Sequence, residues 1–237
     1  SVEFLCETYY HSLASLTDED EFTSQVEKHK KKIEQLFSQT PQIFRNTELI
    51  YSDAIGAKVS QMGFKAQIAE GAKHVLGWRS PNYLYKNHPD GKMFLLLKNF
   101  QLSDDIAFRF SQHSWQGFPL TCDKFVSWLN EIENPDCINL FMDYETFGEH
   151  QWKETGIFDF LKRLPFEVFE RSDFDFATPS DLISRYEAKD LVSSIEPMSW
   201  ADEERDVTAW LGNDLQDDAF EQIYSLSEAL HRSQDEE

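Results

Sequence analysis

The side chains best suited to catalysis follow an apolar segment, Ile138–Met142. Directly after it come Asp143, Glu145, Glu149 and His150. An apolar run of this length predicts a buried strand of a parallel sheet. Residues just beyond the carboxyl end of such a strand lie where α/β proteins place their catalytic groups. The pattern therefore predicts that Asp143 is a catalytic carboxyl group, and the alternative is a solvated acidic loop after the strand.

A second carboxyl group, that of Glu48, lies at the end of another short predicted strand. The segment 42–53 follows Pro41 and runs from apolar residues into Arg45 and Glu48. Two carboxyl groups from two strand ends meet the requirement for cleaving a glycosidic bond, one as nucleophile or base and one as acid. The structural alternative for Glu48 is an ion pair with Arg45 or an exposed position on the following helix.

Four short segments, taken in chain order, resemble motifs of one enzyme family. Asn46–Tyr51 is similar to the third of the five motifs of glycoside hydrolase family 57, and Asp143–Gly148 is similar to the fourth. Ser1–Ser12 resembles the second motif, and Ser199–Asn213 resembles the fifth. The resemblance spans nearly the whole chain and is strongest to the α-amylase-type members of the family.

This resemblance implies an α/β fold, a distorted (β/α)7 barrel that lacks its first strand in this chain and is followed by a helical segment. It also implies retaining, α-amylase-like hydrolysis of α-1,4-glucans or malto-oligosaccharides by double displacement. In that chemistry Glu48 is the nucleophile and Asp143 is the acid/base, whose proton must be retained through burial or a nearby negative charge. Glu145 is expected to share the face of Asp143 by strand alternation and to orient it.

Further residues are implied to bind the substrate. Glu3 and His11 match positions of the second motif that border the substrate in relatives. Trp200 and Asp202 are carried over from the fifth motif. On the residues alone, Glu3 would be an ordinary acid at a strand end and His11 an ordinary hydrogen-bonded histidine, so the assignment of both to the substrate site depends on the resemblance.

Two irregular loops carry aromatic side chains that sugars could contact. Residues 77–92 are rich in proline and glycine and include Trp78, and residues 112–118 include Trp115. Long irregular loops inside a compact domain are usually functional or disordered. The apolar face of a pyranose packs against a flat ring, so Trp78 and Trp115 are predicted to stack on sugar rings. Packing within the loops is the alternative.

The first motif of the family has no counterpart in this sequence. That motif is a His-Gln-Pro-like segment at the end of the first barrel strand, and Ser1 falls where the second strand begins. We therefore expect an additional N-terminal segment of the same protein as a partner of this chain. The expected division is an N-terminally incomplete barrel domain over residues 1–178 and a helical C-terminal segment over 179–237 that packs on it.

Three alternatives remain open from the sequence. A 4-α-glucanotransferase of the same family would pass the glucosyl group to another sugar, and a non-catalytic glucan-binding subunit would fit the missing first motif. A metal site is less favoured: Asp143, Glu145, Glu149, His150 and His11 include suitable ligands, but their spacing matches no closed zinc pattern. We expect neither a metal nor another cofactor.

The acidic composition excludes partners that carry many phosphates. The chain of 237 residues has a formal net charge of -21, which opposes binding to nucleic acid and to anionic membranes. No apolar stretch approaches membrane-spanning length and no signal peptide precedes Ser1. Cys6, Cys122 and Cys137 show no paired spacing, which suits a reducing compartment. We expect a cytoplasmic protein.

Alternating apolar and amphipathic segments must position these residues, a pattern typical of βαβ units in a parallel sheet or barrel. Strands are predicted over Val2–Glu7, Gln42–Glu48, Phe64–Ala69, Met93–Leu97, Ile138–Met142 and Phe166–Phe169. Helices are predicted over Asp18–Phe37 with Thr17 as N-cap, Asp53–Met62, a short segment capped by Ser103, Thr121–Glu131, Ile157–Arg163, Ser180–Tyr186 and Trp200–Leu230, the last interrupted near Gly212.

Overall fold

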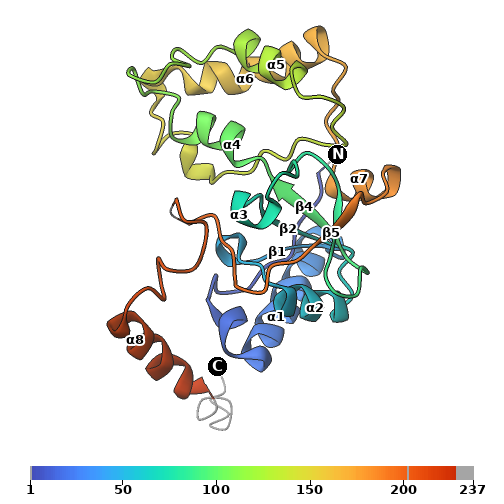
Figure 1. The fold of residues 1–237 in the computed structure, drawn as a ribbon, viewed down its shortest axis with the longest axis vertical. Helices are drawn as coiled ribbons and strands as arrows, with labels where there is room; N and C mark the ends of the chain where they lie inside the picture. Colours follow the sequence, from blue (N-terminus) through green and yellow to red (C-terminus); the bar gives the residue numbers. More distant parts are fainter. Residues whose placement is uncertain (1, 202, 228–237) are drawn as a thin grey trace.

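The computed structural model describes residues 2–201 and 203–227. Within these residues a five-stranded sheet forms with the order β1-β2-β4-β3-β5 (Figure 1). Its strands are β1 (Ile43–Arg45), β2 (Ala66–Glu70), β3 (Tyr85–Asn87), β4 (Phe94–Lys98) and β5 (Asp190–Val192). Strands β1, β2 and β4 are parallel, whereas β3 runs antiparallel to β4 and parallel to β5. The architecture is therefore an α/β fold with a mixed sheet.

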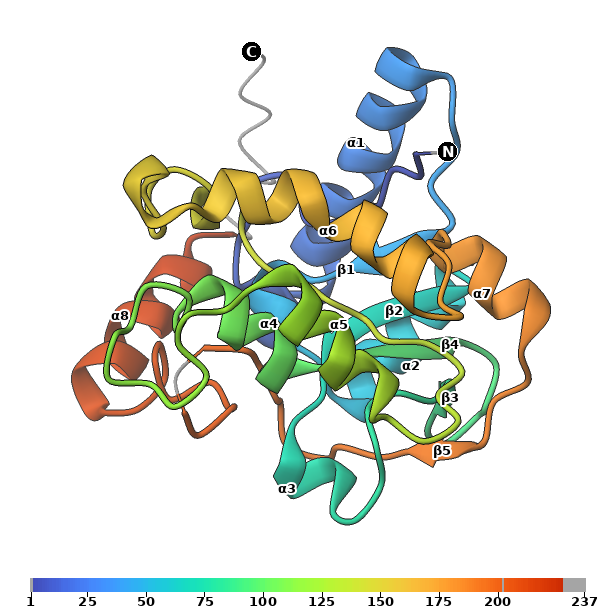
Figure 2. The ribbon, with the colours of Figure 1, turned by 90° about the horizontal axis from the view of Figure 1, so that it is seen from above.

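Helices lie on both sides of this sheet. The described helices are α1 (Glu19–Phe37), α2 (Asp53–Gln61), α3 (Lys73–Leu76), α4 (Phe100–Ala107), α5 (Cys122–Asn130), α6 (Ile157–Arg171), α7 (Pro179–Arg185) and α8 (Asp214–Ser225). Short 3₁₀ turns are η1 (Ala14–Leu16), η2 (Thr47–Leu49), η3 (Tyr144–Thr146) and η4 (Lys153–Thr155). Figures 1 and 2 show α1 and α2 on one side of the sheet and α4, α5 and α6 on the other. Among the described helices, none is both long and apolar enough to cross a membrane.

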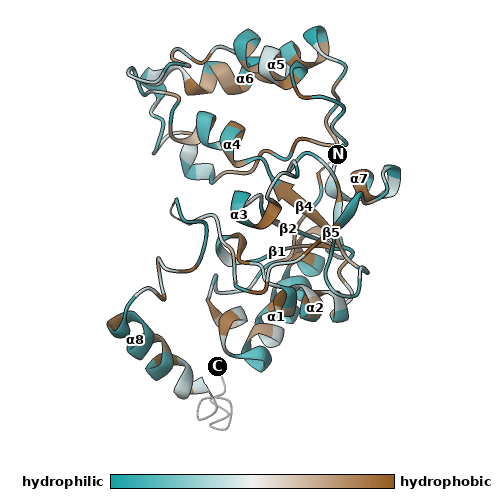
Figure 3. Cartoon of the chain, viewed as in Figure 1, coloured by the Kyte–Doolittle hydropathy of each residue, from teal (hydrophilic) through white to brown (hydrophobic). Residues whose placement is uncertain are grey.

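The apolar side chains of the strands alternate between two cores. Phe44 and Leu97 pack with residues of α1 and α2, whereas Ile43 and Leu96 belong to a core on the opposite face of the sheet. This alternation follows from the two-residue period of a strand. Figure 3 shows the apolar character of β4, whose middle residues are buried. The helices α4, α5 and α6 enclose a third core of their own.

The same alternation places charged residues together at one end of the sheet. Arg45 ends β1, Glu70 ends β2 and Lys98 ends β4. Arg45 lies two residues after Ile43, and Lys98 lies two residues after Leu96, so both share the face opposite α1 and α2. Glu70 pairs with Lys98 in the register of β2 and β4. The carboxyl ends of the parallel strands thus carry a charged rim.

Two predicted strands are reduced to single bridges. The segment 2–7 forms one bridge, between Cys6 and Phe44. Ile138–Met142 also forms one, between Asn139 and Lys98, and both bridges are parallel. In the second segment one backbone hydrogen bond remains, from Asn99 N to Asn139 O at 2.9 Å. Side chains make the others, because Asn139 Nδ2 donates to a backbone oxygen of β4 at 3.1 Å and Phe141 N donates to a serine hydroxyl of α4 at 3.2 Å. The strand predictions for both segments were therefore wrong, because each segment forms only a single bridge, the first to β1 and the second to β4.

The strand predicted over Phe166–Phe169 is wrong, because these residues continue α6. Pro165 lies inside this helix, where its ring removes a backbone N–H. The helix continues past it because apolar side chains at three- and four-residue spacing are buried in the core shared with α5. They are Ile157, Phe160, Leu164 and Val168.

Two helix starts differ from the prediction because asparagine and aspartate form the caps. Asp18, rather than Thr17, is the N-cap of α1, and its carboxylate accepts the backbone N–H of Glu21 at 2.9 Å. Asn99 caps α4, so that helix begins before Ser103. Both side chains accept a backbone N–H that the first helical turn leaves unpaired.

The C-terminal segment contains a strand as well as helices. Residues 179–227 include α7, β5 and α8, and β5 pairs with β3. Of the helix predicted over Trp200–Leu230, only Asp214–Ser225 is an α-helix, and residues 228–230 lie outside the described part. Asn213 starts α8 by accepting two backbone N–H groups of its first turn. The segment therefore extends the sheet that carries the charged rim.

Candidate active site

Glu48 lies directly after β1 in a conformation that few residues other than glycine adopt. Its φ of 53° and ψ of 27° place it in the left-handed region, which costs a non-glycine residue about 1–2 kcal/mol. The backbone oxygen of Glu48 accepts hydrogen bonds from Ser199 Oγ at 2.8 Å and from Trp200 N at 3.2 Å. These contacts with the C-terminal segment hold the turn that directs the Glu48 side chain.

Hydrogen bonds hold both oxygens of the Glu48 carboxylate. His11 Nε2 lies 2.9 Å from Oε1, and Trp200 Nε1 donates to Oε2 at 2.8 Å. The hydrogen bond with His11 lowers the pKa of Glu48, and the hydrogen bond with Trp200 lowers it further. Partial burial opposes this shift. Glu48 is therefore an oriented, ionised carboxylate, as a nucleophile requires.

His11 is the cationic partner of this carboxylate. Its hydrogen bond with Glu48 and the nearby Glu7 carboxylate, 3.9 Å from Nδ1, raise the pKa of His11 to about 9, although partial burial opposes the shift. Glu7 in turn accepts a hydrogen bond from Arg45 Nη1 at 2.7 Å. At neutral pH the imidazole is accordingly protonated and donates to Glu48.

The pKa of Asp143 is shifted in the direction opposite to that of Glu48. Asp143 follows the segment 138–142 and precedes η3. Burial raises the pKa of Asp143, and the negative charges of Glu145 and Glu48 raise it further. Asp143 lines a pocket of about 220 Å³ together with Trp200, whose indole also binds Glu48. A carboxyl group with a raised pKa and one with a lowered pKa therefore lie beside the same indole.

The Trp200 ring is held between cations and an aromatic ring. The Lys98 ammonium lies 4.8 Å and the Arg45 guanidinium 5.5 Å from the Trp200 ring centroid. The ring of Phe141 lies 5.6 Å from that of Trp200, centroid to centroid. Cations near an indole face are attracted by the ring quadrupole. This packing fixes the position of the indole N–H that binds Glu48.

A buried cluster of charges lies beneath Trp200. Lys98 Nζ is 3.7 Å from Glu70 and 3.4 Å from Asp104, and Arg205 contacts the same acids at 3.3 and 2.8 Å. Burial raises the pKa of Glu70, and the charges of Lys98 and Arg205 partly offset it. Arg205 also donates to the Trp200 carbonyl at 2.8 Å. The cluster thus joins β2, β4 and α4 to the segment that carries Trp200.

We predict that Lys98→Met lowers the free energy of unfolding by about 3–5 kcal/mol, because it leaves buried carboxylates with one cation fewer. Urea denaturation followed by circular dichroism measures this. Lys58→Met is the matched control: Lys58 pairs with Glu19, which is 71% exposed, and such a pair contributes about 0–1 kcal/mol. Equal, small losses for the two variants would contradict a structural role for the cluster.

Arg45, Glu70, Lys98, Asp104 and Arg205 were not predicted from the sequence. Lys98 and Glu70 nonetheless carry the signal that singled out Asp143, since each is a charged residue at the carboxyl end of an apolar strand. Asp104 lies inside α4 and Arg205 in an irregular segment. No local pattern distinguishes these last two from solvated charges.

The predicted substrate residues do not all come together. His11 and Trp200 contact Glu48, and the charge of Glu145 acts on Asp143. Glu3 instead accepts hydrogen bonds from the backbone N–H and the hydroxyl of Ser180 at the start of α7. A substrate role for Glu3 stays a prediction.

The two loop tryptophans lie elsewhere. Trp78 is 94% exposed in the loop after α3, and Trp115 lines a pocket beside α4 that does not include Asp143. Asp202 lies outside the described residues. Within the described part of the chain, no three histidine, cysteine, aspartate or glutamate side chains are placed to hold a metal ion.

Comparison with known proteins identifies a family and relatives. Residues 1–195 match the model of the family described as "Glycosyl hydrolase family 57". A curated protein of Methanocaldococcus jannaschii, named "Putative alpha-amylase", is 47% identical over 233 residues, which cover 97% of this chain and 49% of that protein. The chain therefore spans about half the length of this relative.

Solved structures share the fold at low sequence identity. A 4-α-glucanotransferase of Thermococcus litoralis is 16% identical with a TM-score of 0.64, over 81% of this chain and 30% of that one. A branching enzyme of Thermococcus kodakaraensis is 14% identical with a TM-score of 0.69, over 94% and 54%. An α-amylase of Thermotoga maritima is 15% identical with a TM-score of 0.59, over 84% and 52%.

Proposed function

This chain belongs to glycosyl hydrolase family 57, and we propose that it hydrolyses α-1,4-glucans as an α-amylase-like enzyme that retains anomeric configuration. The observation that carries the proposal is the pair of carboxyl groups with opposite pKa shifts, lowered for Glu48 and raised for Asp143. Retaining hydrolysis needs one ionised and one protonated carboxyl group on either side of the scissile bond. The relative named "Putative alpha-amylase" supports the choice of substrate.

In the proposed reaction, Glu48 attacks the anomeric carbon and forms a covalent glycosyl-enzyme. Asp143 donates its proton to the departing glycosidic oxygen at the same time. The Asp143 carboxylate then removes a proton from water, which attacks the anomeric carbon and releases Glu48. Hydrogen bonds from His11 and Trp200 orient the Glu48 carboxylate for the first step.

We also propose that the sheet is part of a distorted (β/α)7 barrel. The parallel bridges of Cys6 and Asn139 extend the series β1, β2, β4 at each end, in the order that a barrel requires. An N-terminal segment of the same protein would then complete the closure. The proposed division into a barrel domain over residues 1–178 and a C-terminal segment over 179–237 places Trp200 on the second part.

Proton NMR of maltoheptaose during digestion tests the proposed activity. Early appearance of the α-anomer at new reducing ends supports retaining hydrolysis, whereas the β-anomer contradicts it. Products longer than the substrate would identify a 4-α-glucanotransferase instead. Binding of the sugar without any turnover would identify a non-catalytic glucan-binding subunit. The Glu48→Gln variant, prepared in parallel, shows whether any activity comes from a contaminant.

We predict that Glu145→Gln shifts the alkaline limb of the profile of kcat/KM against pH to lower pH. Asp143 must be protonated for the first step, and the charge of Glu145 raises its pKa. Removing that charge lets Asp143 lose its proton at lower pH, so activity falls earlier as the pH rises. The acid limb, set by ionisation of Glu48, should stay in place. An unchanged alkaline limb would contradict this role.

A further inference from the structure

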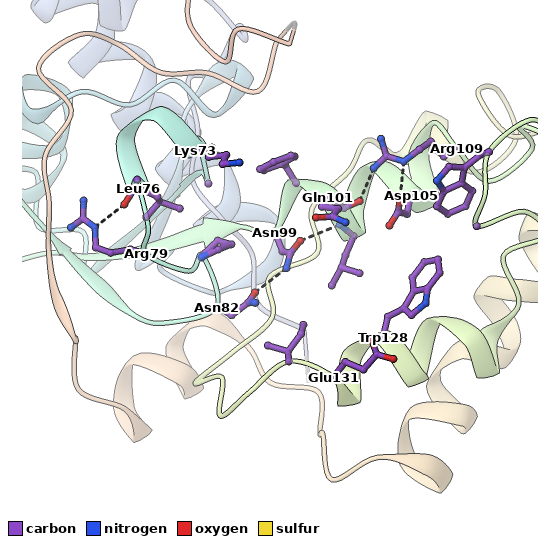
Figure 4. A pocket seen from close by; sticks show the side chains of 18 residues that line it. Lys73, Leu76, Arg79, Asn82, Asn99, Gln101, Asp105, Arg109, Trp128 and Glu131 are labelled. Atoms are coloured by element: carbon purple, nitrogen blue, oxygen red, sulfur yellow. Dashed lines mark hydrogen bonds and ion pairs between the residues drawn. The ribbon is translucent and has the colours of Figure 1, made fainter.

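A larger pocket of about 1020 Å³ lies beside α4 (Figure 4). Its walls come from α3, the loop before β3, α4 and α5. The pocket of about 220 Å³ that Asp143 and Trp200 line is called the catalytic pocket below. Among the described residues, none lines both pockets. Helix α4 separates the two, because Asp104 faces the buried charge cluster while Gln101, Asp105 and Arg109 face the larger pocket.

A buried amide supplies an unused hydrogen-bond donor in this pocket. Asn82 is 6% exposed, and its Oδ1 accepts a hydrogen bond from Asn99 Nδ2 at 3.0 Å. Its Nδ2 donates to no group within the described residues. Figure 4 shows this pair at the pocket wall, near Gln101. Asn82 Nδ2 is not among the buried side-chain atoms that lack a partner, so it is accessible from solvent and free to donate to a ligand.

Two tryptophans form the apolar part of the same pocket. The rings of Trp115 and Trp128 lie 5.9 Å apart with an interplanar angle of 76°, and both rings are only partly buried. In Figure 4 the Trp128 side chain projects from α5 toward α4, and Glu131 lies just after the end of α5. Indole rings beside amides and carboxylates suit a ligand that has apolar C–H faces and many hydroxyl groups.

The two arginines of the pocket are already paired, and the other two charged residues named in Figure 4 besides Asp105, Lys73 and Glu131, carry opposite charges. Arg109 Nε donates to Asp105 at 2.6 Å, and its Nη2 donates to the Gln101 carbonyl at 3.0 Å. Arg79 donates to backbone carbonyls and to Asp190. With a net charge of -21 on the chain, an anionic ligand would be repelled at longer range. A neutral ligand is therefore favoured over a phosphorylated one.

We propose that this pocket is a second carbohydrate-binding site that takes a neutral oligosaccharide segment, separate from the catalytic pocket. The choice of an α-glucan as its ligand rests on the proposed function. Sugar rings would pack on Trp128 and Trp115, and their hydroxyl groups would accept from Asn82 and donate to Asp105. This pocket has a volume of about 1020 Å³, compared with about 220 Å³ for the catalytic pocket, and accommodates several sugar rings.

The indole N–H signals of the tryptophans, observed in ¹⁵N-labelled Glu48→Gln protein, test this proposal during titration with maltoheptaose. The signals are assigned by single tryptophan substitutions. We expect the signals of Trp115 and Trp128 to shift together with one dissociation constant, and that of Trp200 to shift with another. Movement of Trp115 and Trp128 without Trp200 would support this site while counting against the proposed function.

Substitutions in the same protein locate the second site. Trp128→Ala should weaken the affinity measured at Trp115 at least about tenfold, as expected for loss of a central aromatic contact. The exposed Gln101→Ala change should weaken it about threefold to tenfold and needs no repacking. Trp152→Ala is the matched control, because Trp152 is 67% exposed and lines neither pocket.

Two results would overturn the second site. One is an unchanged position of the Trp115 and Trp128 signals at maltoheptaose concentrations up to about 10 mM, which corresponds to binding weaker than about 3 kcal/mol. The other is an equal shift with sorbitol, an acyclic polyol that offers hydroxyl groups without a ring face. Unchanged affinity in both Trp128→Ala and Gln101→Ala would place the sugar elsewhere and also overturn it.

Discussion

Glu48→Gln will lower turnover of maltoheptaose by at least about three orders of magnitude, because covalent catalysis has no substitute nucleophile. The amide can keep the shape of the side chain, and with it contacts with His11 and Trp200, but it cannot form a glycosyl ester. Steady-state release of reducing ends measures the loss. Glu154→Gln, which changes an exposed carboxylate outside the catalytic pocket, should leave turnover unchanged.

Azide rescue shows whether the lost group is the nucleophile. Glu48→Gly leaves space for azide beside the anomeric carbon, and azide attack from that side gives a β-glycosyl azide. The expected result is renewed cleavage of an activated maltosyl fluoride together with this product. A Glu48→Gln protein with near-normal turnover would refute the assignment of the nucleophile.

Asp143→Ala will lower turnover of natural glucans by about 10²- to 10⁴-fold, the usual contribution of a general acid. Formation of the glycosyl-enzyme from maltosyl fluoride should be affected much less, because fluoride leaves without protonation. Burst kinetics with the fluoride, compared with steady-state hydrolysis of maltoheptaose, measure the two effects.

The product of azide rescue separates the two carboxyl groups. In Asp143→Ala, Glu48 still forms the glycosyl-enzyme, and azide then replaces water and gives an α-glycosyl azide. The opposite anomers expected from the Glu48 and Asp143 variants distinguish nucleophile from acid/base. An equal loss with glucan and fluoride, and no azide product, would contradict an acid/base role for Asp143.

Apolar runs predicted the central strands well. Met93–Leu97 and Phe64–Ala69 correspond within one or two residues to β4 and β2, because a strand buried on both faces is mostly apolar along its length. The charged residue that follows such a run also locates the rim, as Asp143 and Glu48 illustrate. Local composition is enough here, since burial of the strand interior depends on the residues themselves.

The outer segments could not be predicted in the same way. Ile138–Met142 has the composition of a strand, yet side chains from Asn139 and Ser103 take over its backbone contacts. Phe166–Phe169 is rich in aromatic residues that favour strands, yet the periodic burial of Ile157 to Val168 continues the helix. In both cases a neighbour that is distant in the sequence decides between local alternatives of similar free energy.

The sequence singled out Glu48 and Asp143 as candidate catalytic groups through their positions after apolar runs, and the resemblance to a family supplied their proposed roles. The opposite pKa shifts that support those roles depend on the folded chain. His11 and Trp200, 37 and 152 residues from Glu48, meet at its carboxylate and lower its pKa, while burial and neighbouring charges raise that of Asp143. Protonation depends on solvent exclusion and on charges within a few ångströms, and these arise only when distant segments pack together.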